Sequence, residues 1–222
     1  MSLRLAICLL CLSTTAPSRE LTRHGGRGVL LELPTDTSHY GDGYAARLVT
    51  RLERARANIS LQLPPWHTPA EIHVIVQPSM THFTQRCGRP WFSAGAWLPQ
   101  LGYICLPPPR VLEQRPELDA ELRHEIGHAL LHELLPGCPL WFVEGLMLHL
   151  AGQHPAQTHS TDMLAGKELK RALASPRSPA EAETAYALAY WGVAVMLESF
   201  TPGTLIGALP TICSHLHASP RH

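Results

Sequence analysis

The chain has 222 residues, of which 45% are hydrophobic and 16% charged, a composition that supports a buried core and excludes a disordered chain. Lysine plus arginine equals aspartate plus glutamate at 18 each, so no overall charge points to nucleic acid as a partner. This length allows one domain or two lobes around a shared core. The 14 histidines are unusual, and they make metal binding worth testing.

The N-terminal residues are typical of a secretory signal peptide. Arg4 precedes an apolar run over residues 5–12, and small residues follow it, so we expect a signal peptide over residues 1–16 and cleavage after Ala16. The alternative is a buried N-terminal helix. The apolar run is shorter than the ~18–20 residues that span a bilayer, so we expect no stable membrane insertion after its removal. The expected location is secreted or periplasmic.

The cysteines agree with export. Cys8 and Cys11 lie in the segment that is removed, which leaves four cysteines, at positions 87, 105, 138 and 213. An even number of cysteines in an exported chain predicts two disulfides, although four cysteines allow three connectivities. We favour Cys87–Cys105 and Cys138–Cys213, because each pair then ties together one lobe.

Strand patterns dominate the first half of the chain, apart from one helix. Apolar residues at helical spacing predict that helix over residues 44–61, before Pro64-Pro65. Short runs that are β-branched or alternate in polarity predict strands at 28–33, 71–76, 91–97 and 101–106.

The second half of the chain predicts helices only. Proline, acidic residues and a Ser-Pro-x-Glu capping box mark helix starts, and Pro-Gly pairs mark ends. We expect helices at 116–135, 139–151, 162–174 and 178–200, and a last one of about ten residues after Gly203. The fold class is therefore α+β. We expect one domain over 17–222, with a small mixed sheet in an N-lobe (about 28–136) and a helical C-lobe (about 137–222).

The helix predicted over residues 116–135 carries the motif His-Glu-x-x-His at 124–128. Residues four apart share one helix face, so the imidazoles of His124 and His128 can bind one Zn²⁺ at ~2.0–2.1 Å. Glu125 is turned about 100° from His124, where it can reach a water beside the metal without filling a coordination position. This arrangement suits a general base next to a metal-activated nucleophile.

The third metal ligand must come from another segment. Leu131 and Leu134 exclude the continuation His-x-x-Gly-x-x-His, and His132 lies one turn too far along the helix. Glu144 stands in the apolar segment 141–146, where a carboxylate is costly to bury unless a cation compensates it. Two histidines and one glutamate, with water in the fourth position, form the ligand set of a catalytic zinc site.

These motifs together resemble one family. His124-Glu125-x-x-His128, the short Pro-Gly-x-Pro link and the segment Trp-Phe-Val-Glu-Gly-Leu at 141–146 look like the gluzincin zinc metallopeptidases, and most closely the small peptidase MA-like bacterial domains. The likeness covers about residues 28–212. It implies a zincin-like fold, zinc bound by His124, His128 and Glu144, and Glu125 as base and then acid. It also implies a tyrosine that stabilises the oxyanion, for which Tyr186 matches better than Tyr190.

The sequence therefore predicts an exported zinc-dependent metallopeptidase that acts on a peptide or protein. Two alternatives stay open. The same zinc site could hydrolyse a non-peptide amide, or the chain could be a catalytically inactive zincin-fold module that binds a partner or acts as a chaperone. Glu125 argues against the inactive module, because a structural metal site needs no base. Residues 94–97 could be an edge strand that aligns an extended peptide, or a plain structural hairpin.

Overall fold

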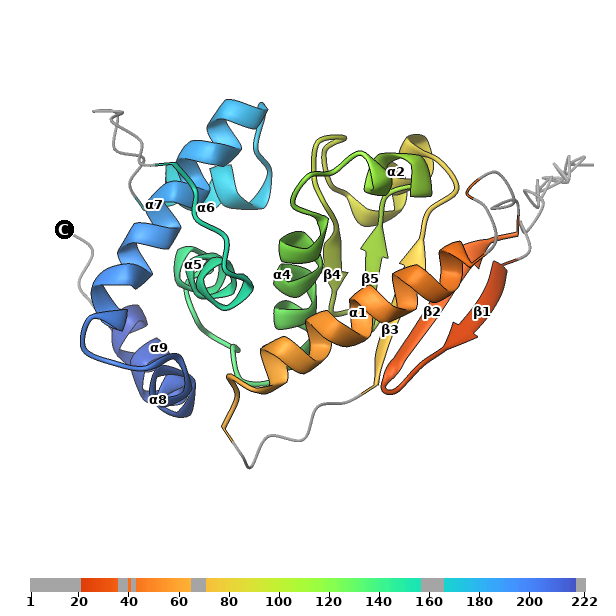
Figure 1. Ribbon diagram of the computed structural model, residues 1–222. Helices are drawn as coiled ribbons and strands as arrows, with labels where there is room; N and C mark the ends of the chain where they lie inside the picture. Colours follow the sequence, from red (N-terminus) through yellow and green to blue (C-terminus); the bar gives the residue numbers. More distant parts are fainter. Residues whose placement is uncertain (1–20, 36–39, 41–42, 65–70, 157–165, 219–222) are drawn as a thin grey trace, which may run out of the picture.

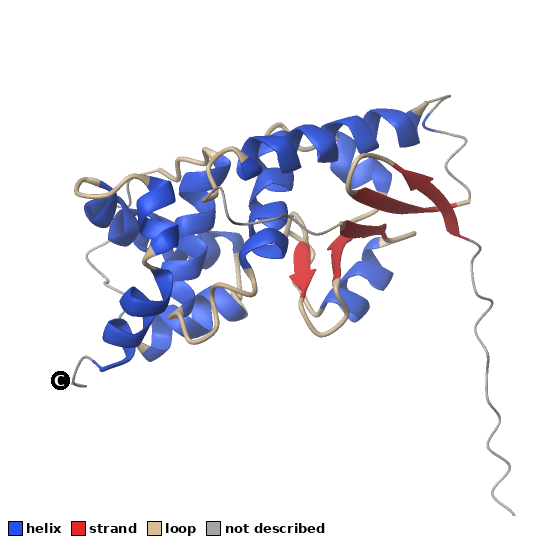
Figure 2. Cartoon of the chain, turned by 90° about the horizontal axis from the view of Figure 1, so that it is seen from below, coloured by secondary structure: helices blue, strands red, loops and turns tan. Residues whose placement is uncertain are grey.

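The computed structural model describes residues 21–35, 40, 43–64, 71–156 and 166–218. The signal peptide expected at residues 1–16 lies outside the described residues. Figure 1 shows the two halves of the molecule, with the strands on one side and most of the helices after residue 140 on the other. Figure 2 shows the same separation from below.

The described strands form one mixed sheet in the order β1-β2-β3-β5-β4. Parallel pairing joins β2 to β3 and β3 to β5, while β1 and β4 add antiparallel edges. The strands are short, and their bounds are β1 (Leu21–Gly25), β2 (Val29–Pro34), β3 (Ile72–Val76), β4 (Ala96–Leu98) and β5 (Tyr103–Leu106).

Helices cover both faces of this sheet. Side chains alternate across a strand, so Val74 and Ile104 point to one face, where α1 (Tyr44–Ser60) and α4 (Leu118–Leu131) pack against each other and on the sheet. Cys105 and Tyr103 point to the other face, which α2 (Met80–Cys87) covers at β5. The short α3 (Pro109–Glu113) connects β5 to α4.

The C-terminal lobe is helical. Its central element is α5 (Leu140–Ala151), which packs on α4 on one side and on α7 (Pro179–Leu197) on the other. The remaining helices are α6 (Lys167–Ala174), α8 (Pro202–Gly207) and α9 (Leu209–Ala218). One apolar core runs from the sheet through α4 to α5 and α8, so α4 lies between the two lobes.

The structure confirms the mixed α/β class, the small mixed sheet and the helical second half. Both expected disulfides are present: Cys87–Cys105 ties α2 to β5, and Cys138–Cys213 ties the link between α4 and α5 to α9. Two disulfides fit an extracellular location. None of the helices in the described part of the chain has the length and apolar character needed to span a bilayer.

Several predicted boundaries are wrong. Residues 91–95 do not form a strand: 91 and 92 form a turn, and 93–95 have no regular structure. Arg115 binds the carbonyl oxygens of Phe92 and Ser93, which a strand would use for its ladder. The helix expected to reach residue 135 ends at Leu131, where the chain turns back. The last helix is two helices, α8 and α9. The first four residues of the helix expected at 162–174 lie outside the described residues, and β1, α2 and α3 were not predicted.

Candidate metal centre

The two histidines of the motif face the same point because α4 is a regular helix through residues 118–131. Their ring centroids are 4.9 Å apart. The Nε2 atoms of His124 and His128 are 3.1 Å apart, so both rings direct this nitrogen to one place. His132, one turn further, is exposed and turns its ring to Trp97 instead. The structure therefore brings together His124 and His128 and leaves His132 out.

Glu144 reaches the same point from α5. Its Oε2 atom lies 3.2 Å from Nε2 of His124 and 3.5 Å from Nε2 of His128. The residue is only 3% exposed. One ligand atom from each of these residues lies within 4.8 Å of the other two, so this buried group could hold a metal ion. The sequence predicted Glu144 as the third ligand from the cost of burying its carboxylate, and Glu144 does lie beside the two histidines.

Glycines let the three helices come close enough. A Cβ atom on Gly145 would lie 2.2 Å from the carbonyl oxygen of Ala189 on α7, and one on Gly127 would lie 2.7 Å from Sδ of Met147 on α5. A side chain at position 145 would push α7 from α5, and one at position 127 would displace the side chain of Met147. Since α5 carries Glu144, the close packing of the helices sets the distance from its carboxylate to the histidines.

The chemistry of the donor set fits a cation. Nδ1 of His124 lies 2.9 Å from Oε1 of Gln153, and an amide oxygen only accepts hydrogen bonds, so Nδ1 carries the proton. In the neutral ring, Nε2 then presents a lone pair to the carboxylate of Glu144. Two electron-rich atoms 3.2 Å apart repel each other unless a proton or a metal ion lies between them.

The pKa values of His124 and Glu144 also indicate that positive charge is favoured beside the carboxylate. Burial disfavours the protonated ring of His124, but the hydrogen bond and charge of Glu144 outweigh burial and raise its pKa. Burial also disfavours the carboxylate of Glu144, yet His128 and His124 hold its pKa well below its usual value. The site therefore favours a carboxylate that is neutralised by a cation at the imidazoles.

The edge strand β4 orients Glu125. Oε2 of Glu125 accepts a hydrogen bond of 2.9 Å from the backbone N–H of Trp97, and the residue is 9% exposed. A Cβ atom on Gly95 would lie 3.0 Å from Cγ of Glu125, so the glycine leaves room for this carboxylate. Whether residues 94–97 align a peptide stays a prediction, and β4 is an edge strand of the sheet. Only 96 and 97 belong to β4, and the N–H of Trp97 is already engaged.

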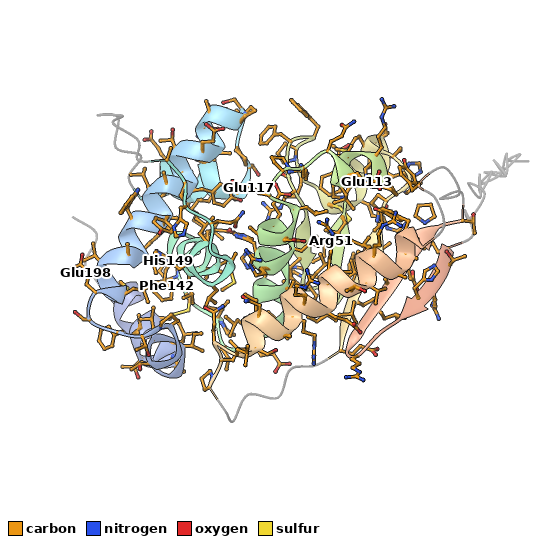
Figure 3. All side chains as sticks on the ribbon, in the orientation of Figure 1. Arg51, Glu113, Glu117, Phe142, His149 and Glu198 are labelled. Carbon is orange, nitrogen blue, oxygen red and sulfur yellow. A yellow bond between two sulfur atoms is a disulfide. The ribbon has the colours of Figure 1, made fainter. Side chains whose placement is uncertain are left out.

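Of the two candidate tyrosines, Tyr186 lies at the centre. Its ring is 6.3 Å from that of His124 and nearly perpendicular to it. Burial, followed by the charge of Glu144, raises the pKa of Tyr186, so its hydroxyl keeps its proton. Tyr190 is engaged elsewhere. Its hydroxyl lies 2.7 Å from Nδ1 of His154, and its ring stacks on His149, which Figure 3 shows on the side of α5 toward α7.

A cavity of about 820 Å³ opens over the centre. Every predicted site residue lines it, namely His124, Glu125, His128, Glu144 and Tyr186. Half of its other lining residues come from residues 89–97 of the sheet lobe and from residues 176–183 before and in α7. The three potential ligands, Glu125 and Tyr186 therefore border one space.

Gln153 is the site residue that sequence reasoning missed. It follows Gly152, which ends α5 in the left-handed conformation at φ 68°, and the reversed chain brings Gln153 back to His124. The glycine after the apolar helix was a signal for this turn. Nothing in the sequence indicated which side chain the turn would place at the histidine.

Comparisons with protein-family models and with curated proteins gave no match to this chain.

Proposed function

We propose that the protein is an exported zinc-dependent metallopeptidase of the gluzincin type. One observation carries the proposal: the buried group formed by His124, His128 and Glu144 lines a cavity of about 820 Å³ that Glu125 also lines. A structural zinc site is closed by four protein ligands, whereas a catalytic one has three and an open position. Three ligands that border an open cavity fit the catalytic kind.

Zinc is the metal that this donor set favours. Calcium and magnesium prefer all-oxygen ligands, while two imidazoles and one carboxylate are typical of catalytic zinc. When bound, zinc would supply a Lewis acid that makes water more acidic and polarises a carbonyl group. Gln153 would hold His124 in the tautomer that directs Nε2 to the metal.

The protein's own residues would handle the protons. Glu125, held by the N–H of Trp97, would take a proton from the attacking water and then pass it to the leaving amine. The protonated hydroxyl of Tyr186 would donate a hydrogen bond to the oxygen of the carbonyl under attack, where negative charge develops. Peptide hydrolysis needs both actions, and a metal-storage protein needs neither.

The two alternatives differ in what they require of Glu125 and of the substrate. A zinc hydrolase of non-peptide amides would use the same residues but would leave peptides intact. An inactive binding module would keep its zinc and its partner without any need for the base. One set of variants separates the three functions.

The test measures bound zinc and hydrolysis in the mature protein. We expect the wild type to bind one zinc ion per chain and to cleave unstructured peptides. Glu125→Gln should keep the metal and lose at least about 100-fold in kcat/KM, because the amide cannot transfer protons. Glu144→Ala should lose zinc and activity together. Glu133→Gln is the matched control, because Glu133 is exposed and does not line the cavity.

Specific outcomes would contradict the proposal. If Glu125→Gln cleaves peptides as fast as the wild type, Glu125 is not the base. If the wild type cleaves small acyl amides but no peptide, the amide hydrolase is correct. If it binds zinc and cleaves neither, the inactive module is correct. Stoichiometric zinc in Glu144→Ala would remove Glu144 from the ligand set.

A further inference from the structure

Two arginines line the cavity over the metal centre, and they differ in their ion pairs. The acidic residues in the cavity wall are Glu117, Glu121, Glu125, Glu144 and Glu183, and the two arginines there are Arg89 and Arg115. Arg115 is paired with Glu121 at 2.8 Å. Arg89 forms no ion pair with any described residue, although it is partly buried. It is therefore a cation without an acidic partner inside a site that we propose to be catalytic.

The position of Arg89 is fixed by the backbone on both sides of the cavity. It follows Gly88, which ends α2 in the left-handed conformation at φ 63°. NH1 of Arg89 donates a hydrogen bond of 3.1 Å to the carbonyl oxygen of Ala174, at the end of α6. Figure 1 shows α2 in the sheet lobe and α6 in the helical lobe. The hydrogen bond of Arg89 to Ala174 therefore connects the two lobes.

The hydrogen bond to Ala174 leaves most of the guanidinium free. A guanidinium has five N–H donors in one plane, and one of them is used here. The charge also belongs to the cavity wall that includes Tyr186 and the three potential metal ligands. Tyr186 in turn contacts the ring of His124. Among the described residues, the guanidinium thus has one hydrogen-bond partner, and it lines the same cavity as the potential metal ligands.

The second cavity indicates how a substrate could lie. A cavity of about 750 Å³ adjoins the first, and both are lined by Arg115, Glu117, Gln153 and His154. Together the two cavities extend from the metal centre to α1. Arg89 lines the cavity over the metal centre and not the second one. A polypeptide could thus occupy both cavities and reach Arg89 with one of its groups.

The geometry points to Arg89 as the residue that binds a carboxylate of the substrate and so sets its specificity. This inference rests on the proposed peptidase function. A planar guanidinium recognises a carboxylate by two parallel hydrogen bonds. In a peptide, that group is either the C-terminal carboxylate or the side chain of an aspartate or glutamate. The first source would make the protein a carboxypeptidase-like enzyme, and the second an endopeptidase selective for acidic residues.

Two matched substrate pairs distinguish the two sources. The first pair is one peptide with a free C-terminal carboxylate or with a C-terminal amide. The second is an amidated peptide with an internal glutamate or with glutamine in its place. We expect the wild type to prefer the carboxylate member of one pair by about 10- to 100-fold in kcat/KM, as charged hydrogen bonds allow. Arg89→Met should reduce that preference to about one.

Two further variants control for charge and folding. Arg89→Lys keeps the charge but not the two parallel hydrogen bonds, so its preference should lie between those of the wild type and Arg89→Met. Arg86→Met removes an exposed arginine of α2 that does not line the cavity, and it should keep the full preference. Far-UV circular dichroism and bound zinc show whether each variant is folded.

A binding measurement separates this inference from the proposed function. The four peptides are titrated by calorimetry into zinc-loaded Glu125→Gln protein, with and without Arg89→Met. A preference for a carboxylate that depends on Arg89 supports the inference even if the wild type cleaves no peptide. If the wild type shows no preference in either pair, or if Arg89→Met keeps it, the inference is wrong.

Discussion

The side chains around His124 hold the ring of this potential metal ligand in place. Its ring has Gln153 on Nδ1 and Glu144 and His128 at Nε2. The hydrogen bond from Nδ1 fixes both the tautomer and the tilt of the ring, and a ring that is already oriented loses less entropy when the metal binds. Gln153 should therefore contribute to metal affinity without touching the metal.

Replacement of Gln153 tests this contribution. Gln153→Ala should weaken zinc binding by about 10- to 100-fold, because His124 loses the acceptor that fixes its tautomer. Gln153→Glu keeps an acceptor oxygen and should keep most of the affinity. Competition with a chromophoric zinc chelator measures both. Gln85→Ala is the control, since Gln85 is exposed on α2. Equal affinities for Gln153→Ala and the wild type would show that packing alone orients the ring.

Among the residues of the site, the sequence could predict those whose relative positions are set within one short segment. His124, Glu125 and His128 lie in one helical motif, so their relation follows from helix geometry. Glu144 could be predicted from the cost of burying a carboxylate among apolar residues. The partners Gln153 and Trp97 could not, because a turn after α5 and a strand on the opposite wall bring them to the site. Their positions depend on the packing of distant segments.

Among the elements, α5 has the most demanding environment, since it packs between α4 and α7. Gly145 faces the backbone of α7, whereas Gly127 on α4 faces the thioether of Met147. A backbone carbonyl cannot move away from a new methyl group without moving its helix, but a methionine side chain can change rotamer. The same substitution at these two glycines should therefore have different consequences.

Substitution of each glycine by alanine measures that difference. Gly145→Ala should lower the free energy of unfolding by about 3 kcal/mol or more, because the Cβ atom collides with the carbonyl of Ala189. Gly127→Ala should change it by only about 1 kcal/mol, since the helix propensity of alanine offsets the contact with Met147. Denaturant unfolding gives both values.

Gly207→Ala is the control for these two variants, because a Cβ atom there would meet no other atom within 4 Å. Bound zinc provides a second measurement, since Gly145 is next to the ligand Glu144. A Gly145→Ala protein that is as stable as the wild type would show that the approach of α5 and α7 does not depend on this glycine.

The elements that could be predicted are those with a strong internal signal. The start of α7 follows from its capping box, and Ser178 does accept the N–H of Glu181. The short helix α2 has a comparable cap, in which Ser79 accepts the N–H of His82. It was not predicted because its eight residues include few apolar ones. Edge strand β1 was missed because its side chains are mostly exposed, so no alternation marks it.

For the whole molecule, the order of strands and helices in the sequence predicted two lobes, but not how the chain connects them. The parallel neighbours β2, β3 and β5 are joined through α1 and α2, and such crossovers leave no pattern in a single strand. The cysteines gave the long-range information that periodicity lacked. Their even number and their positions indicated which distant segments meet, and both predicted pairs are present.

The two disulfides should differ in what they contribute to stability. Cys138–Cys213 spans 75 residues and Cys87–Cys105 spans 18. A disulfide restricts the unfolded chain more when it closes a longer loop, by ~4 kcal/mol for the first and ~3 kcal/mol for the second. We expect the double variant Cys138→Ala/Cys213→Ala to unfold at a lower temperature than Cys87→Ala/Cys105→Ala, as measured by calorimetry.

Bound zinc is a second quantity to measure in the two double variants. The ligands lie on α4 and α5, which pack directly on each other, so both double variants should still bind one zinc ion per chain when folded. Treatment of the wild type with a reducing agent should reproduce the combined loss of stability. If the pair that closes the shorter loop proves more stabilising, contacts of the buried Cys105 in the folded state outweigh the restriction of the unfolded chain. The disulfide Cys138–Cys213, which joins the segment before α5 to α9, would then serve mainly to hold the helical lobe in place.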